Sequence, residues 1–239
     1  MYSFLEKVFE FKAWSFFLLL IRFSTIALFL YITGRGLDLD VPNIPILEQS
    51  IRTVIFHVPL WIGMNVLFMA AFVMSIAYLI KPYWKLDVAI KECVNVGIVF
   101  GILGFITGMQ WASTTWGSFL PPDIKVKASA ITMLIYLAYL VLRSSLSEGV
   151  QRAKVSAVYN VFAFVAMLYL IWVLPRQAAS LHPGNGGNPL FSSNDMDGTI
   201  RPIFRSGLIA YTLLACWIAN IRYRMSKLDY QLKEKMYNE

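Results

Sequence analysis

The residues best suited to chemistry in this chain of 239 residues are its only two histidines, His57 and His182. Both fall at the boundaries of apolar segments, and between them lies a tryptophan-bearing stretch, Trp111–Lys127 (WASTTWGSFLPPDIKVK). Neutral imidazole is a common ligand of transition metals, and tryptophan offers a large, flat apolar surface. Such a set can hold a flat, metal-containing ligand if the fold brings the three elements together.

The composition is that of an integral membrane protein. Hydrophobic residues make up 58% of the chain and charged residues only 15%, whereas soluble domains carry about 25% charged residues. The apolar residues form long runs near the length that crosses a bilayer. The formal net charge is +7, but the basic residues lie in short loops and in the tail, where membrane proteins use them for orientation. The lipid bilayer, and not a nucleic acid, is therefore the expected environment.

The apolar runs predict an all-α fold, a bundle of six transmembrane helices that forms a single domain over residues 1–239. The expected spans cover approximately 15–33, 57–80, 89–110, 128–142, 155–174 and 203–221. The third loop is then the Trp111–Lys127 stretch, in which Pro121 and Pro122 stop helix formation. A short interfacial segment is expected within this loop.

An even number of spans places both termini on one side of the membrane. Thirteen Lys and Arg residues belong to the termini and to the loops on their side, and seven belong to the opposite loops. Because basic residues favour the cytoplasmic side, both termini are expected in the cytoplasm. The loop before His57, the third loop and the loop with His182 then share the outer face.

Several residues inside the apolar segments have structural explanations. Arg22 interrupts the first span and needs a partner or a path to the interface. Cys93 and Cys216 form no CxxC pair and are expected to be small buried hydrophobes. Small residues spaced for close helix packing, and not for phosphate binding, recur in the third span: Gly97, Gly101, Gly104 and Gly108.

The residue types on the outer face suit haem or another planar ligand. Imidazoles on the two sides of a porphyrin, from His57 and His182, would give six-coordinate iron. Trp111, Trp116 and Phe119 could provide aromatic surface for the macrocycle.

Charged residues near these aromatics complete the hypothesis. Arg52, five residues before His57, and Lys125 or Lys127 could pair with the two propionates of haem. Asp123 is expected to orient the loop or to cap a short interfacial helix, not to act as an acid–base catalyst.

Alternative functions have weaker support. A small-molecule transporter or channel without iron is the alternative, motivated by the glycines of the third span and by Arg22. An enzyme is not expected, because the chain has no Ser/His/acid set, no HExxH motif and no second carboxylate near Asp123. Covalent haem attachment is not indicated either, because no CxxCH motif occurs.

Separated motifs resemble a known family. They are RTVIFHVPLW at Arg52–Trp61, TTWGSFLPPDIKVKAS at Thr114–Ser129, LIYLAYLVLR at Leu134–Arg143 and LHP at Leu181–Pro183. Together they resemble CcmC, the haem-delivery family of bacterial cytochrome c maturation, which belongs to the wider haem-handling proteins with a tryptophan-rich WWD loop. The resemblance covers all six spans in order. It implies that His57 and His182 are axial haem ligands and that the loop between them is the haem platform.

The platform of the resembled family normally reads WGTWWxWDxR. Three positions of this chain match the motif: Trp116, Gly117 and Asp123. Lys125 replaces the arginine and Phe119 takes the place of one tryptophan, while Leu120 and Pro122 stand where two more tryptophans would be.

The resemblance further implies a delivery function with haem b as cargo. The protein would hold haem at the outer leaflet of a bacterial inner membrane, with its site facing the periplasm. It would pass the haem to a periplasmic haem chaperone similar to CcmE. ATP-binding-cassette subunits similar to CcmA and CcmB would supply energy, because this chain contains no nucleotide-binding motif.

Overall fold

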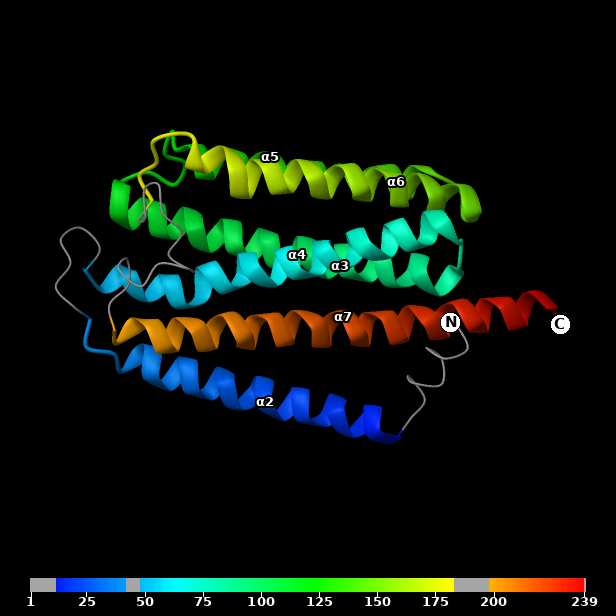
Figure 1. Cartoon of the computed structure of the whole chain (residues 1–239), viewed down its shortest axis with the longest axis horizontal. Coiled ribbons are helices and arrows are strands. Elements are labelled where there is room, and N and C mark those ends of the chain that lie inside the picture. Colours follow the sequence, from blue (N-terminus) through cyan, green and yellow to red (C-terminus); the bar gives the residue numbers. More distant parts are fainter. Residues whose placement is uncertain (1–11, 42–47, 183–197, 239) are drawn as a thin grey trace.

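The computed structural model describes residues 12–41, 48–182 and 198–238, and all of their regular structure is helical. In Figure 1 the long helices run side by side as a bundle, with α5 and α6 on one side, α3 and α4 in the middle, and α7 and α2 beyond them. In chain order the elements are α2 (Lys12–Leu37), the 3-10 helix η1 (Glu48–Thr53), α3 (Val54–Ile80), α4 (Trp84–Trp116), α5 (Ile124–Ser145), α6 (Val150–Met167), the π-helix η2 (Leu168–Val173), the 3-10 helix η3 (Leu174–Arg176) and α7 (Ile200–Asn238).

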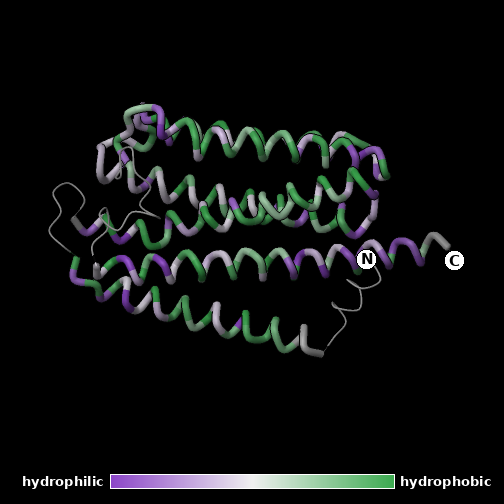
Figure 2. Tube along the Cα trace, viewed as in Figure 1, coloured by the Kyte–Doolittle hydropathy of each residue, from purple (hydrophilic) through white to green (hydrophobic). Residues whose placement is uncertain are grey.

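Six stretches among the described residues are long and apolar enough to cross a membrane, which confirms the predicted six-helix fold. Figure 2 shows hydrophobic residues along the middle of the bundle and hydrophilic residues gathered toward its ends. The start of α2 and the end of α7 lie at one end of the bundle, whereas the start of α3 lies at the other (Figure 1). Any site near His57 is therefore remote from the ends of the described chain.

The helices extend beyond the predicted spans. Helix α4 continues to Trp116, and α7 continues through the charged tail to Asn238. Helical backbone satisfies its own hydrogen bonds, and long charged side chains reach water from the helix surface, so an apolar run ends before its helix does. The prediction of a loop over Trp111–Lys127 was therefore wrong in its bounds, since only residues 117–123 connect α4 to α5, without a helix of their own.

The connection from α4 to α5 is defined at both ends by specific residues. Gly117 ends α4 with a φ of 72°, and its N–H donates to the Ser113 carbonyl at 3.1 Å. This left-handed conformation favours glycine. Asp123 begins α5 as its N-cap and accepts from the Lys125 N–H at 2.8 Å. Asp123 is thus a cap, as predicted, but of a membrane-spanning helix and not of an interfacial one.

Helices α3, α4 and α5 approach one another closely at the glycines of α4. A Cβ at Gly97 would lie 2.4 Å from Cε1 of Phe68, and one at Gly101 would lie 2.4 Å from Sδ of Met133. Phe68 is fully buried and stacks on Tyr136 with ring centroids 3.5 Å apart. These glycines therefore serve helix packing, as the sequence pattern predicted.

We expect Gly97→Ala to destabilise the bundle by about 1–3 kcal/mol, the usual effect of overpacking a filled core. The added methyl group meets a ring that Tyr136 holds in place. Gly34→Ala is the matched control, because a Cβ at Gly34 meets nothing within 4 Å. Thermal unfolding in detergent micelles measures both variants, and equal stability of the two would contradict the packing assignment.

Two ionic contacts, each with one buried partner, hold the other end of the bundle, where α4 begins. Arg143 of α5 donates two hydrogen bonds of 2.7 Å to Asp87. Glu92, which has no exposed surface, accepts from Arg222 at 3.0 Å and from Ser226 at 2.7 Å, both on α7. Buried charges need such partners. They tie α4 to α5 and α7 far from the histidines.

The isolated polar residues of the apolar segments lie as follows. The guanidinium carbon of Arg22 lies 5.7 Å from the ring centroid of Trp217, which supplies the partner that its depth requires. Cys93 is half-buried, whereas Cys216 is exposed on the outside of the bundle. The expectation of burial was therefore wrong for Cys216, because its side of α7 faces outward, where lipid replaces protein as the apolar surroundings.

Candidate functional site

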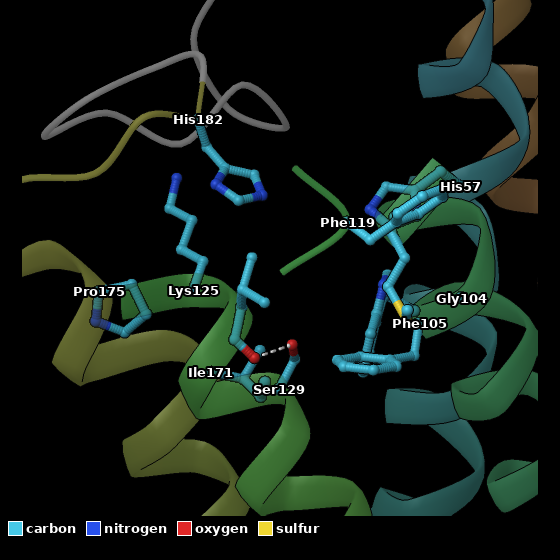
Figure 3. Close-up of a pocket in the computed structure, with 13 residues that line it drawn as sticks. His57, Gly104, Phe105, Phe119, Lys125, Ser129, Ile171, Pro175 and His182 are labelled. Carbon is cyan, nitrogen blue, oxygen red and sulfur yellow. Dashed lines mark hydrogen bonds between the residues drawn. The ribbon is translucent and has the colours of Figure 1, made fainter. Parts of the chain in front are cut away.

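His57 and His182 line one cavity of about 170 Å³ at the end of the bundle where α3 begins. Figure 3 shows His57, from α3, on one side of this cavity, and His182 and Lys125 on the other. The lining comes from α3, α4, the connection to α5, α5 itself, and the chain from η2 onward: His57, Trp61, Gly104, Phe105, Gly108, Met109, Phe119, Lys125, Val126, Ser129, Ile171, Pro175 and His182.

His57 is held against α4 in the first turn of α3. Its Nδ1 lies 3.1 Å from Oγ1 of Thr107. Its ring meets two tryptophans edge to face, with centroid distances of 5.9 Å to Trp111 and 6.5 Å to Trp61. A Cβ at Gly108 would lie 2.7 Å from Cε1 of His57. Because Gly108 has no side chain, the imidazole of His57 can pack against α4 at this position.

Asp123 anchors the segment that carries His182. Its Oδ2 accepts from the Leu181 N–H at 2.7 Å and from the Ser180 hydroxyl at 2.8 Å. Its Oδ1 lies 3.1 Å from Nδ1 of His182 and also accepts from the Lys125 N–H that it caps. Only 3% of Asp123 is exposed. One buried carboxylate thus joins the start of α5 to the His182 segment.

The electrostatics of this contact favour an ionised carboxylate and a neutral ring. Burial alone would raise the pKa of Asp123, but hydrogen bonds from Leu181 and Ser180 and the nearby His182 lower it below its ordinary value. Burial lowers the pKa of His182, and this outweighs the opposing attraction of Asp123. At neutral pH the ring then donates Nδ1–H to Asp123 and keeps a lone pair on Nε2, the form in which histidine binds metals.

Other predicted residues surround His182. The ring of Trp116 lies 4.9 Å from that of His182, centroid to centroid. Phe119 lines the cavity while 54% exposed, so its ring is available to a ligand at the cavity mouth. Lys125 also lines the cavity and is its cationic group. Gly117 contributes the turn that follows Trp116.

The cavity lining does not include five of the predicted residues: Trp116, Gly117 and Asp123, described above, and Arg52 and Trp111. Arg52 donates to the carbonyls of Gly36 and Leu39, both at 2.6 Å, and thereby holds the end of α2. Trp111 lies behind His57 and donates from Nε1 to the Ser50 hydroxyl at 3.1 Å. Their place in the structure is to support the wall that carries His57.

Several lining residues escaped the sequence analysis. Trp61 follows His57 by four residues, and this helical spacing could have placed it on the same face. Ile171 and Pro175 belong to the end of the fifth span, which forms the π-helix η2 and the 3-10 helix η3. Such interruptions of an α-helix are frequent at functional sites, but an apolar run in the sequence does not predict them.

The arrangement suits a metal that brings its own equatorial ligands. Among residues 12–41, 48–182 and 198–238, no group of three or more His, Cys, Asp or Glu side chains could hold a bare metal ion. Iron in a porphyrin needs only two axial ligands, and an apolar wall suits the macrocycle. The cavity of about 170 Å³ is below the roughly 300–1,000 Å³ of sites that enclose drug-sized ligands. A macrocycle would therefore be enclosed only in part.

Comparisons with known proteins agree with this chemistry. The family model described as heme exporter protein C, CcmC, matches residues 8–237. Heme exporter protein C of Haemophilus influenzae is 24% identical over 163 residues, which are 67% of this chain and 65% of the relative. Heme exporter protein C of Bradyrhizobium diazoefficiens is 30% identical over 113 residues, 46% of this chain and 41% of the relative.

A second group of relatives has a different name. Cytochrome c biogenesis protein CcsA of Heterosigma akashiwo is 35% identical over 80 residues, which are 34% of this chain and 23% of the relative. The chain spans 65% or less of the length of these three relatives. The family match, in contrast, covers nearly the whole chain. With a six-helix fold and two histidines on one cavity, the chain belongs to the CcmC family, heme exporter protein C.

Proposed function

We propose that this protein binds haem in the cavity between His57 and His182, with both imidazoles as axial ligands, and delivers it for cytochrome c maturation. One observation carries the proposal: the only two histidines of the chain, far apart in sequence, line the same cavity. The names of the relatives, heme exporter and cytochrome c biogenesis protein, support haem as the cargo, and the form that we propose is haem b. Haem is here a substrate that is handed on, and no catalysis is proposed.

Residues in and beside the cavity lining would each contribute to holding this cargo. Phe119 in the lining and Trp116 beside His182 offer aromatic surface, and Lys125 can pair with a propionate as a point charge. Asp123 keeps His182 in place and in its neutral form. Because Phe119 is exposed and the cavity encloses little volume, one edge of the macrocycle would stay accessible to an acceptor protein.

We further propose that the cavity faces the periplasm of a bacterial inner membrane. The basic residues divide thirteen to seven in favour of the side with both termini, which is the bias of a cytoplasmic side. His57, which lines the cavity, belongs to the first turn of α3. The start of α3 lies at the end of the bundle opposite the start of α2 and the end of α7 (Figure 1). A periplasmic haem chaperone similar to CcmE could reach the cavity there, while subunits similar to CcmA and CcmB would supply energy.

The residues that motivated the transporter alternative, the glycines of α4 and Arg22, have other contacts in the structure. Large side chains fill the space beside the glycines of α4, including Phe68 beside Gly97 and Trp61 beside Gly104. Gly97 and Gly101 therefore line helix contacts, and Gly104 and Gly108 line the cavity that we assign to haem. Arg22, the other reason for the alternative, lies over Trp217.

Visible absorption spectroscopy tests the proposal directly. We expect the detergent-solubilised protein, titrated with haem b, to give the spectrum of a six-coordinate, low-spin haem, because two neutral imidazoles are strong-field ligands. The control is the same titration with zinc protoporphyrin, whose metal does not favour a second axial ligand. A protein that leaves the spectrum of free haem unchanged, or that binds haem only in a high-spin form, would contradict the proposal.

A further inference from the structure

Thr107 is the polar partner of His57, and its hydroxyl has several neighbours. Oγ1 lies 3.1 Å from Nδ1 of His57, 2.9 Å from the Leu103 carbonyl and 3.0 Å from the Gly104 carbonyl. A hydroxyl has one proton to donate and two lone pairs that accept. Which of the three neighbours receives the proton decides which nitrogen of His57 carries hydrogen.

The geometry favours donation from Thr107 to its own helix. Threonine hydroxyls in helices commonly donate to the carbonyl three or four residues earlier, and both such carbonyls lie within reach. Toward His57 the oxygen is then an acceptor. An oxygen that accepts from Nδ1 of His57 requires a hydrogen on that nitrogen.

We propose that Thr107 is a positioning residue, which holds His57 in the Nδ1–H tautomer so that Nε2 presents its lone pair to the cavity. A neutral imidazole has a single N–H, so occupying Nδ1 leaves Nε2 bare. The role of this tautomer in binding iron rests on the proposed function. The tautomer itself does not, because it is a property of the protein without haem.

The glycines near Thr107 leave room for the ring of His57. The missing side chain at Gly108 lets His57 reach the hydroxyl, since a Cβ there would lie 2.7 Å from Cε1. One helical turn earlier, a Cβ at Gly104 would lie 3.0 Å from Nε1 of Trp61. The side chains of His57 and Trp61, both from α3, therefore pack against the segment from Gly104 to Gly108, which also carries the hydroxyl of Thr107.

His182 is held in a parallel way by a different group. Its Nδ1 faces the carboxylate of Asp123, whereas Nδ1 of His57 faces a neutral hydroxyl. A carboxylate partner makes a ligating imidazole a stronger donor than a neutral partner does. The two imidazoles therefore have unequal hydrogen-bond partners.

Nitrogen NMR of the protein without haem tests the tautomer. Because the chain has only two histidines, ¹⁵N-histidine labelling gives four ring signals, which His182→Gln assigns. We expect His57 to be protonated on Nδ1 and bare on Nε2. Thr107→Val removes the oxygen at nearly constant shape and should move His57 toward the Nε2–H tautomer, while Thr107→Ser should restore the original signals.

The His182 signals serve as the internal control for folding. They should stay unchanged in both Thr107 variants, since Asp123 holds that ring independently. The inference is overturned if His57 of the unmodified protein is protonated on Nε2. It is overturned as well if Thr107→Val leaves the His57 signals where they were.

Haem titration then connects the tautomer to binding. We expect Thr107→Val to weaken haem affinity by about tenfold, the lower end of the usual effect of removing the outer partner of a ligating histidine. Thr107→Ser should bind as the unmodified protein does. Failure of the unmodified protein to bind haem would sink the proposed function and leave the NMR result intact. Intact haem binding with the wrong tautomer would sink only the role of Thr107.

Discussion

Replacing either His57 or His182 with alanine is expected to convert the haem-loaded protein from six-coordinate, low-spin iron to five-coordinate, high-spin iron. Each substitution removes one axial ligand, and no third histidine exists to replace it. The loss of affinity should exceed the roughly 10–100-fold that removal of an outer hydrogen-bond partner costs. Replacing both should abolish the low-spin spectrum altogether. Absorption and electron paramagnetic resonance spectra measure the change.

A matched control separates ligation from general damage to the bundle. Gly34→Ala alters a site that has nothing within 4 Å of the new methyl group and should keep the low-spin spectrum. Free imidazole added to His57→Ala or His182→Ala should restore six-coordination, because a small ligand can enter the vacated space. An unchanged spectrum in the double variant would refute the assignment of both ligands.

Asp123→Ala is expected to release the His182 segment from the bundle. The substitution removes the cap of α5, worth about 1 kcal/mol. It also removes the acceptor of two part-buried hydrogen bonds, from the Leu181 amide and the Ser180 hydroxyl, and hydrogen bonds to a charged group are worth about 1.5–3 kcal/mol each. We expect faster hydrogen exchange at the Leu181 amide and faster loss of bound haem. Exchange measured by mass spectrometry and haem transfer to apomyoglobin report these two effects.

Asp123→Asn is the graded comparison, because an amide keeps one acceptor oxygen and loses the other. With the amide oxygen in the place of Oδ1, the cap of α5 and the contact with His182 survive, while Leu181 and Ser180 lose their acceptor. We expect slower but measurable haem transfer and a preserved low-spin spectrum. Ser180→Ala, which removes one hydroxyl and no charge, should change less. An Asp123→Asn protein that loses the low-spin spectrum as completely as a histidine variant would contradict a positioning role for Asp123.

The amino-acid sequence alone predicted the membrane spans of this protein and which loops share a side. Long apolar runs predict membrane spans because a helix in lipid must be apolar over its whole crossing, whatever its neighbours are. An even number of spans then brings the loop before His57 and the loop with His182 to the same side. Both predictions depend on local composition and on parity, which need no knowledge of packing.

Only the tertiary structure decided how the site is built. Trp111 and Trp116 are helical because α4 continues until Gly117, and Arg52 serves the end of α2 because those carbonyls lie within its reach. Thr107 and Asp123 each hold one imidazole from another part of the chain. The hydrogen-bond partner of a ring nitrogen is set by side chains from other helices. Spacing along one helix therefore cannot reveal which nitrogen faces the cavity.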